Sequence, residues 1–332
     1  MIDKAILHVL DFHTGLCVVS EQELDLAQQE VYAYLEQRLQ KLPADPTGRQ
    51  GCFYKDSRLG AAAARYFQGA LSFAEISGQI AHAVYDALAS CEETATADVV
   101  VADFRDERQT RYLAILLLEA QIAYTHQISR VDGEMCTQLI RHRAILPNKL
   151  QKIRSYALIR EDNLQLSLAD KKRSCEGREI RILPERVLQC TVQLSSKETV
   201  RTVTKLIAAV AAEHGADSVE VSAKTKQYIA ENAAQCDSFT PREAGAAVFA
   251  DTPVLQEEFS RQCGERQLPD SVPVSSTWAQ KVGNVHTIKT DTGIEITFPS
   301  AYIEHSEFIH FSTQEDGSLS IELKHIGAIT NK

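Results

Sequence analysis

The sequence predicts an α+β protein with three parts. Two nearly continuous apolar runs, Asp98–Phe104 and Tyr112–Leu118, are typical of strands that are covered on both faces. Helix-capping patterns recur from Ser195 onward, and after Lys281 short β-rich segments alternate with turn residues. We therefore expect an N-terminal, mostly antiparallel sheet with helices on one side (residues 1–185), a helical middle segment (186–265) and a small C-terminal antiparallel β domain (266–332).

The first forty residues predict two strands and a helix. Ala5–Asp11 and Leu16–Val19 flank a His-Thr-Gly turn. Ser20 followed by Glu23 matches a capping box, and apolar residues then recur at helical spacing. We expect this helix to end before Pro43.

The rest of the N-terminal part predicts one more helix and further strands. Residues 41–56 are rich in proline and glycine and predict a loop, and Ser72 with Glu75 predicts a helix to about Ser90. The polar stretch between the two apolar runs connects them as a hairpin. Additional strands are expected over Thr137–Leu146, Ile153–Arg160 and Leu164–Leu168.

Helices return in the middle of the chain. Ser195 with Glu198 is another capping box, and Gly215 stands where the residue after a helix belongs. Residues 264–276, with two prolines, predict a linker into the terminal strands. Further helix starts are expected at Asp217, Thr240 and Asp251.

The last fifty residues predict two hairpins that form a small antiparallel sheet. His286–Lys289 and Ile294–Phe298 flank the turn sequence Asp291-Thr-Gly. Phe308–Phe311 and Leu319–Leu323 flank a Glu-Asp-Gly-Ser turn, in which the glycine supplies a positive φ.

This tail resembles the bacterial nucleoid-associated proteins of roughly 37 kDa. The resemblance lies in Ile288–Pro299, Asp316–Ile321 and Ile326–Lys332, and more loosely in Ile153–Asp170 and Val187–Lys205. It is a likeness of the whole pattern, without a catalytic signature. The resemblance implies a cytoplasmic bacterial protein that associates with the folded chromosome, the nucleoid.

The composition conflicts with nucleic-acid binding by the chain as a whole. The 35 Lys and Arg are outnumbered by 45 Asp and Glu, which gives a net charge of −10. Proteins that bind phosphates usually present a surplus of Lys and Arg, so the field of this chain should repel DNA at long range. Any direct contact must therefore come from a local basic patch.

One segment supplies such a patch. Between Arg141 and Arg181 there are eleven Lys and Arg against five acidic residues, a local charge of +6 that leaves −16 for the rest of the chain. If most of this surplus contacts duplex phosphates, a plot of log affinity against log salt concentration should have a slope on the order of −5. The residues that we predict to contact DNA are Arg141, Arg143, Lys149, Lys152, Arg154, Lys171, Lys172, Arg173, Arg178 and Arg181.

Two alternatives explain the same charges without DNA. The cations can form the solvated rim of an acidic protein, or they can match acidic residues of a second copy in a homodimer. Only Tyr156 adds an aromatic ring to the segment, which argues against base stacking on single strands. Direct contact should therefore involve the backbone with little sequence recognition.

The cysteines and the N-terminus favour an intracellular protein. No two of the eight cysteines lie closer than Cys175 and Cys190, fifteen residues apart, so zinc-ribbon and CxxC redox sites are not expected. Scattered cysteines fit buried thiols in a reducing cytosol. The N-terminus lacks the apolar core of a signal peptide, and no apolar run is long enough to span a bilayer.

Motifs of enzymes are weak. Asp291-Thr-Gly matches the triplet of retroviral-type aspartic proteases, but its polar flanks favour a turn. Neither a dinucleotide fingerprint nor a P-loop occurs, so we expect no cofactor. Four histidines lie in the tail without a paired spacing that is typical of metal ligands: His286, His305, His310 and His325.

These observations favour a non-enzymatic nucleoid-associated protein that contacts double-stranded DNA weakly. A homodimer is compatible with them. The rival from another class is an acidic interaction module that reaches the nucleoid through a DNA-binding protein partner, and the charge of −16 outside the patch favours it. A hydrolase built on the tail histidines is a third, weaker hypothesis.

Overall fold

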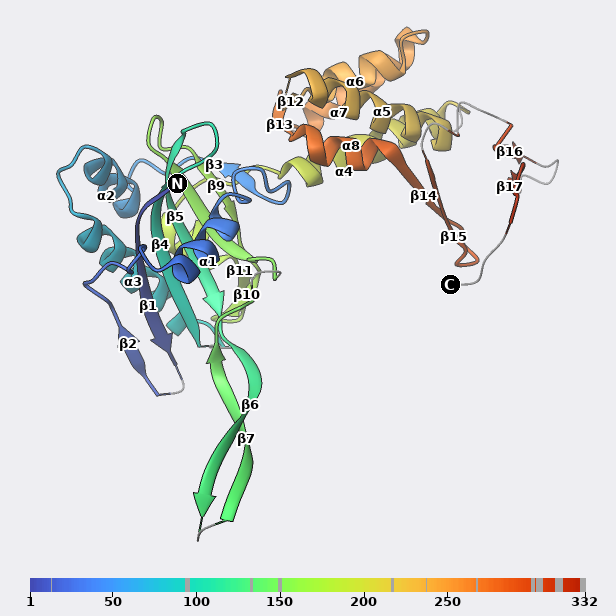
Figure 1. Cartoon of the computed structure of the whole chain (residues 1–332). Helices are drawn as coiled ribbons and strands as arrows, with labels where there is room; N and C mark the ends of the chain where they lie inside the picture. Colours follow the sequence, from blue (N-terminus) through green and yellow to red (C-terminus); the bar gives the residue numbers. More distant parts are fainter. Residues whose placement is uncertain are drawn as a thin grey trace. The chain divides into compact units, whose positions relative to one another are not determined.

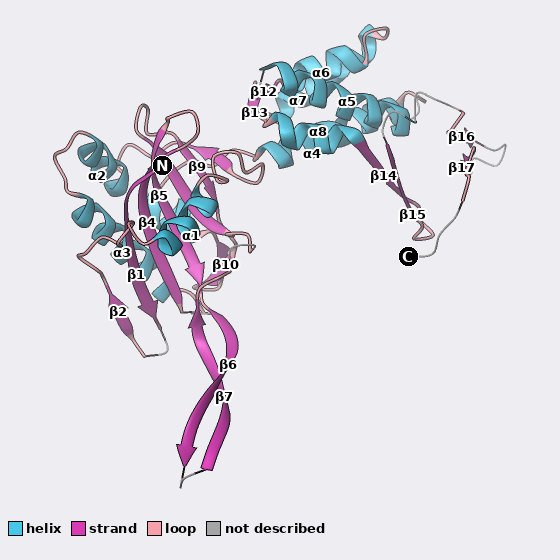
Figure 2. Cartoon of the chain, in the orientation of Figure 1, coloured by secondary structure: helices cyan, strands magenta, loops and turns pink. Residues whose placement is uncertain are grey.

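The computed structural model describes residues 1–12, 14–92, 96–131, 134–148, 151–215, 218–236, 238–266, 268–299, 302, 307–313 and 319–328. The chain forms two compact units, Met1–Gln193 and Leu194–Lys332. Figure 1 colours it from blue at the N-terminus to red at the C-terminus, and Figure 2 distinguishes its helices from its strands. The α+β class is confirmed.

The first unit is built on one antiparallel sheet. Its seven strands follow the order β2-β1-β4-β5-β8-β9-β3, and every neighbouring pair is antiparallel. The long apolar runs form the two central strands, as the sequence predicts. The strands are β1 (Ile2–Asp11), β2 (Leu16–Val18), β3 (Arg49–Gly51), β4 (Ala97–Arg105), β5 (Arg111–Glu119), β8 (Ser155–Arg160) and β9 (Leu166–Ala169).

Helices cover both faces of this sheet, which corrects the expectation of helices on one side. The helices α2 (Arg58–Phe67) and α3 (Phe73–Ala89) pack with the π-helix η1 (Leu183–Leu188) on one face, against residues such as Val99. The helix α1 (Gln29–Leu39) packs on the other face, where Val100 points. The alternation of β4 and β5 side chains between two apolar layers explains their uninterrupted hydrophobic sequence.

One of the two predicted helix starts in this unit is right and the other is wrong. Ser72 and Glu75 form the expected capping box of α3. Ser20 caps no helix. Its backbone N–H donates to Nδ1 of the buried His8 at 3.1 Å, and its hydroxyl donates to the Gln22 carbonyl. The helix α1 begins only at Gln29.

The predicted loop 41–56 contains the edge strand β3, which pairs with β9. The helix α2 was not expected from the sequence. Its N-cap is Ser57, whose hydroxyl accepts from the N–H of Gly60 at 3.0 Å. The sequence does contain a signal for α2 that the prediction did not use, because the buried residues Leu59, Ala62, Ala63 and Tyr66 recur at helical spacing.

A long two-stranded hairpin continues the centre of the sheet, and we call β6 (Gln121–Val131) with β7 (Glu134–Ile145) the arm. Only Ala120 separates β6 from β5, and the arm extends away from the end of the sheet (Figure 1). Its strands pair with each other, in a sheet separate from the seven-stranded one. The predicted strand 137–146 is confirmed as part of β7, whereas β6 was missed.

The second unit is mainly helical. Its helices share one core in which Val203, Ile207 and Phe259 are fully buried, and Ser195 with Glu198 forms the predicted capping box. Within the predicted linker, Val272 pairs with Phe239 of another short strand. The elements are α4 (Ser196–Glu213), α5 (Ser218–Cys236), β12 (Ser238–Phe239), α6 (Pro241–Val248), α7 (Pro253–Glu265), β13 (Val272–Pro273) and α8 (Ser276–Asn284), the last of which was not expected.

The tail forms the two predicted hairpins. The first pairs β14 (Val285–Lys289) with β15 (Glu295–Pro299), and Gly293 at φ +91° makes its turn. The second pairs β16 (Ile309–Thr313) with β17 (Leu319–Leu323), and the turn expected there falls outside the described residues. Among the described residues the hairpins are two separate pairs, so the expectation of one common sheet is wrong.

Candidate nucleic-acid interface

A small hairpin carries the centre of the predicted basic patch. It consists of β10 (Arg173–Cys175) and β11 (Arg178–Ile180), and we call it the basic hairpin. Glu176 at φ +54° and Gly177 at φ +74° form its turn. Two successive residues with positive φ are typical of the two-residue hairpin turns whose twist matches that of the strands.

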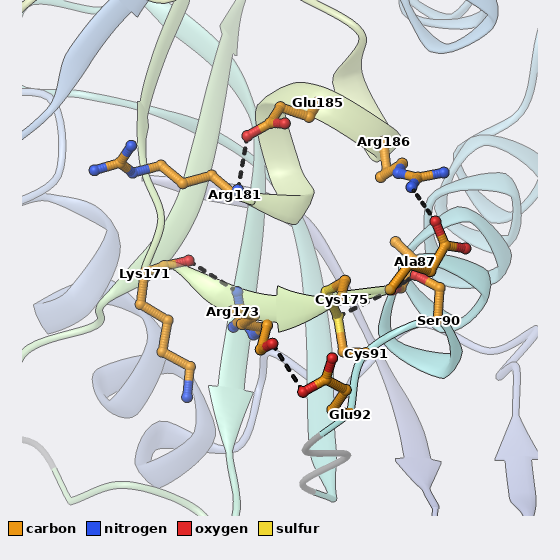
Figure 3. The surroundings of a disulfide bond; sticks show 12 residues. Ala87, Ser90, Cys91, Glu92, Lys171, Arg173, Cys175, Arg181, Glu185 and Arg186 are labelled. Atoms are coloured by element: carbon orange, nitrogen blue, oxygen red, sulfur yellow. Dashed lines mark hydrogen bonds and ion pairs between the residues drawn. A yellow bond between two sulfur atoms is a disulfide. The ribbon is translucent and has the colours of Figure 1, made fainter. Parts of the chain in front are cut away.

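A disulfide joins this hairpin to the end of α3. Cys175 is bonded to Cys91, 84 residues earlier, and both are buried (Figure 3). The expectation of reduced thiols is therefore wrong for this pair, while the other six cysteines are free. Spacing could not reveal the pair, because the fold alone brings two cysteines from distant segments together.

Next to the disulfide, Glu92 holds the basic hairpin through three hydrogen bonds. Its carboxylate accepts from the Ser174 hydroxyl at 2.8 Å and from the Gly177 N–H at 3.0 Å. Its own N–H donates to the Ser174 carbonyl at 2.9 Å. The hairpin is thus fixed along one strand and at its turn.

Arg173 is a buried structural cation. Its guanidinium donates to Asp170 at 2.8 Å, to Glu119 at 3.2 Å and to the Ser155 hydroxyl at 3.3 Å, and 6% of its side chain is exposed. Asp170 is fully buried and also accepts from the Leu183 N–H at 2.8 Å. These contacts bring the basic hairpin to the end of β5, to the start of β8 and hence to the base of the arm.

Other predicted DNA-contacting cations also form ion pairs or hydrogen bonds within the chain. Lys171 forms an ion pair with Glu119, and Lys172 pairs with Glu179 at 2.8 Å, a hydrogen bond that lowers the pKa of the Glu179 carboxyl. The Arg181 side chain donates to the Asp170 carbonyl at 3.2 Å.

Lys152 is neutralised by a separate loop. Its ammonium lies 3.0 Å from Asp45 and 2.8 Å from the Thr47 hydroxyl. Burial raises the pKa of Asp45, but hydrogen bonds from Thr47 and Lys152 outweigh it, and the pKa of this carboxyl is lowered. Lys152 therefore balances a half-buried carboxylate.

Three of the predicted residues are exposed and free of such contacts. Within the described part of the chain, the guanidinium groups of Arg141 on the arm, Arg154 before β8 and Arg178 on the basic hairpin form no hydrogen bond or ion pair. The side chain of Arg143 and the whole of Lys149 lie outside the described residues. That any of the ten residues contacts DNA stays a prediction.

Counting cations in the sequence missed the carboxylates that hold them. Glu119 precedes Lys171 by 52 positions and Asp45 precedes Lys152 by 107, so the local charge of +6 omits two of the partners. Asp170 lies inside the segment, but only its burial shows that it organises the site. The prediction of DNA-contacting residues also omitted the exposed Arg130 on β6, because this residue lies outside the segment from Arg141 to Arg181.

The weak enzymatic motifs occupy exposed turns and strands. Asp291-Thr-Gly forms the turn of the β14–β15 hairpin, where the Gly293 N–H donates to the Thr290 carbonyl at 3.1 Å. His305 lies outside the described residues. In the described ranges, His, Cys, Asp and Glu side chains do not gather in a set of three or more that can hold a metal ion.

The family model described as nucleoid-associated protein YejK matches residues 6–328, nearly the whole chain. The chain belongs to this family. The match extends through both structural units and confirms the resemblance seen in the tail. No curated protein matches the chain. Across the described residues, no helix combines the length and the hydrophobicity needed to traverse a bilayer.

Proposed function

We propose that this protein is a non-enzymatic component of the bacterial nucleoid that contacts the backbone of duplex DNA weakly and directly. Membership of a nucleoid-associated family supports the nucleoid role. The observation that carries direct contact is the set of exposed arginines without carboxylate partners, Arg141, Arg154 and Arg178. Arg154 directly precedes β8, Arg178 directly follows the turn of the basic hairpin, and Arg141 lies on the arm.

These side chains suit phosphate contact. A guanidinium stays charged at any physiological pH and binds phosphate oxygens through two parallel hydrogen bonds. Because three free arginines replace the surplus of six charges counted in the sequence, the salt slope should be about −3 per chain. Phosphate contacts carry no sequence information, so binding should depend little on the sequence of the duplex.

A matched pair of triple variants tests this proposal. Arg141→Gln, Arg154→Gln and Arg178→Gln together remove three exposed charges, and Lys152→Gln, Lys171→Gln and Lys172→Gln together remove three paired charges. Binding to a fluorescent duplex is measured by anisotropy over a series of salt concentrations. We expect the arginine variant to lose most binding and nearly all of the salt slope.

The lysine variant is the control, because it changes the net charge equally. It should retain the salt slope of the wild type and lose affinity only modestly through the long-range field. Equal losses in the two variants would overturn the assignment to the exposed arginines. Binding by neither variant nor wild type in low salt would overturn direct contact altogether.

A second candidate function is an acidic adaptor that reaches the chromosome through a DNA-binding protein. It is favoured by the charge of the second unit, in which 12 Lys and Arg stand against 19 Asp and Glu. The internal pairing of Lys152, Lys171, Lys172 and Arg173 also reduces the free positive charge. This candidate predicts no mobility shift with bare duplex and a shift when a DNA-binding partner is added.

A further inference from the structure

The arm has an apolar face, with a row of large apolar side chains, and a more polar face opposite to it. Directly opposed residues of its two strands project to the same side, and successive pairs alternate. One side therefore carries four consecutive pairs, each with one large apolar residue. These pairs are Tyr124 with Arg141, His126 with Leu139, Ile128 with Thr137, and Arg130 with Met135.

Solvent reaches all of these apolar side chains. Tyr124, Ile128, Met135 and Leu139, with Ile122 at the base, are between 55% and 74% exposed. The opposite side of the arm is more polar. It presents Thr125, Gln127, Ser129 and Gln138, while its apolar residues Ile140 and Cys136 are only partly exposed. An exposed apolar row of this length on one side of a hairpin is typical of an interaction surface.

We propose that this apolar face binds the same face of a second copy of the chain. With each of the five side chains more than half exposed, the face offers on the order of 500 Å² of apolar surface per copy. Two faces together would bury on the order of 1,000 Å², which reaches the lower bound of a specific interface. A two-stranded hairpin is also only marginally stable alone, and packing against a second one supplies the missing layer.

The charges on the face are compatible with this pairing. In successive pairs on this face, the apolar residue lies alternately on β6 and on β7. A two-fold axis parallel to the arms brings β6 of one copy over β7 of the other. It therefore places Arg141 over Tyr124 of the second copy and Arg130 over Met135. No arginine then faces an arginine. The aliphatic part of Arg141 covers the Tyr124 ring, while its guanidinium stays at the solvated edge of the arms and open to phosphate.

The distribution of the apolar residues favours protein over DNA. Proteins that insert apolar side chains into DNA use a wedge at a single base step. Here a large apolar residue occurs in every pair on this face, from Tyr124 near the base to Met135 near the turn. This continuous row matches a protein surface of equal length.

The test compares two adjacent residues that point to opposite faces. Leu139→Asp places a charge in the middle of the apolar face, and Gln138→Asp places the same charge on the polar face. The mass of the full chain is measured without DNA by sedimentation equilibrium over a range of concentrations. We expect about twice 36.8 kDa for the wild type and Gln138→Asp, and 36.8 kDa for Leu139→Asp at concentrations where the wild type is dimeric.

Thermal unfolding of both variants establishes that they are folded, since neither residue belongs to the core. A wild type that stays monomeric, a dimer that persists in Leu139→Asp, or a dimer lost equally in Gln138→Asp would each overturn the proposal. A monomeric wild type whose DNA binding is abolished by Leu139→Asp would assign the face to DNA instead. Because the mass is measured without DNA, its outcome is independent of the proposed function.

Discussion

Two hairpins of the first unit, the basic hairpin and the arm, differ in how their arginines are placed. The basic hairpin is held by a disulfide, by Glu92 and by the buried pair of Arg173 with Asp170. The arm is hydrogen-bonded to the rest of the unit at its base, where the Gln151 amide donates to the Gln121 side chain at 2.8 Å, and its residues Arg130 and Arg141 are exposed among apolar side chains. A cation in the sequence can thus belong to the internal structure or to an outer surface.

The comparison shows what determines the role of each charge. The basic hairpin lies against the sheet, where a buried cation is tolerated only with a partner, so carboxylates accompany Arg173, whereas Arg178 on the outer strand is exposed. The arm leaves the sheet, and water solvates its arginines at little cost. Burial and the position of nearby carboxylates, rather than the local density of Lys and Arg, therefore determine which cations remain available to phosphates.

The largest effect is expected from removing the internal cation. Arg173→Ala leaves the buried Asp170 carboxylate without its cation and leaves Glu119 with Lys171 alone, and it should lower the free energy of unfolding by about 3–5 kcal/mol. Urea unfolding of the full chain measures this change. Arg178→Ala, on the opposite strand of the hairpin, is the control and should change it by less than about 0.5 kcal/mol. Similar changes in the free energy of unfolding for the two variants would contradict the distinction between structural and free cations.

The disulfide should have the next largest effect. Replacing both Cys91 and Cys175 by Ala opens a loop closed over 84 residues and should cost about 2–4 kcal/mol of stability. Melting temperatures with and without reductant measure the same cost in the wild type. The exposed Cys52→Ala should melt as the wild type does in both conditions. A wild type that melts identically with reductant would show that the bond does not hold the basic hairpin.

Shortening the arm should affect stability less. Replacing Tyr124–Arg141 by Asn-Gly joins Ala123 to His142, an opposed pair, through a favourable two-residue turn. Since these residues lie outside the core, the free energy of unfolding should change by about 1 kcal/mol or less. Urea unfolding measures it. A loss comparable to that of Arg173→Ala would mean that the arm is part of the cooperative core.

The smallest effect is expected from an exposed ion pair of the basic hairpin. In Lys172→Gln, the pKa of Glu179 should rise toward its ordinary value, as measured by NMR titration. A carboxyl whose pKa is lowered on folding contributes stability above its unfolded pKa, and this contribution is lost as the pH falls through the folded value. The variant should therefore lose slightly less stability on acidification than the wild type. An unchanged pKa would show that the pair does not persist in solution.

The sequence predicts local features well and long-range partners poorly. The capping boxes at Ser72 and Ser195 specify helices through residues three positions apart, and the β4 and β5 runs specify buried strands. The same pattern at Ser20 failed because His8, twelve residues away, takes its backbone N–H.

The candidate site could be predicted only in part for the same reason. The cluster of cations is visible in the sequence, but the partners that neutralise several of them arrive from β5 and from the loop before β3. Likewise, the row of exposed apolar residues on the arm appears only when β6 and β7 are paired in register, because no strand alone carries all of it.

The continuity of β5 with β6 gives the arm a firm mechanical anchor. It grows from a central strand that is hydrogen-bonded on both sides, through nine paired residues to β4 and six to β8. A pull along the arm therefore loads many backbone hydrogen bonds in shear at once, instead of peeling an edge strand away one bond at a time. Tension applied to the arm is therefore distributed across the middle of the sheet.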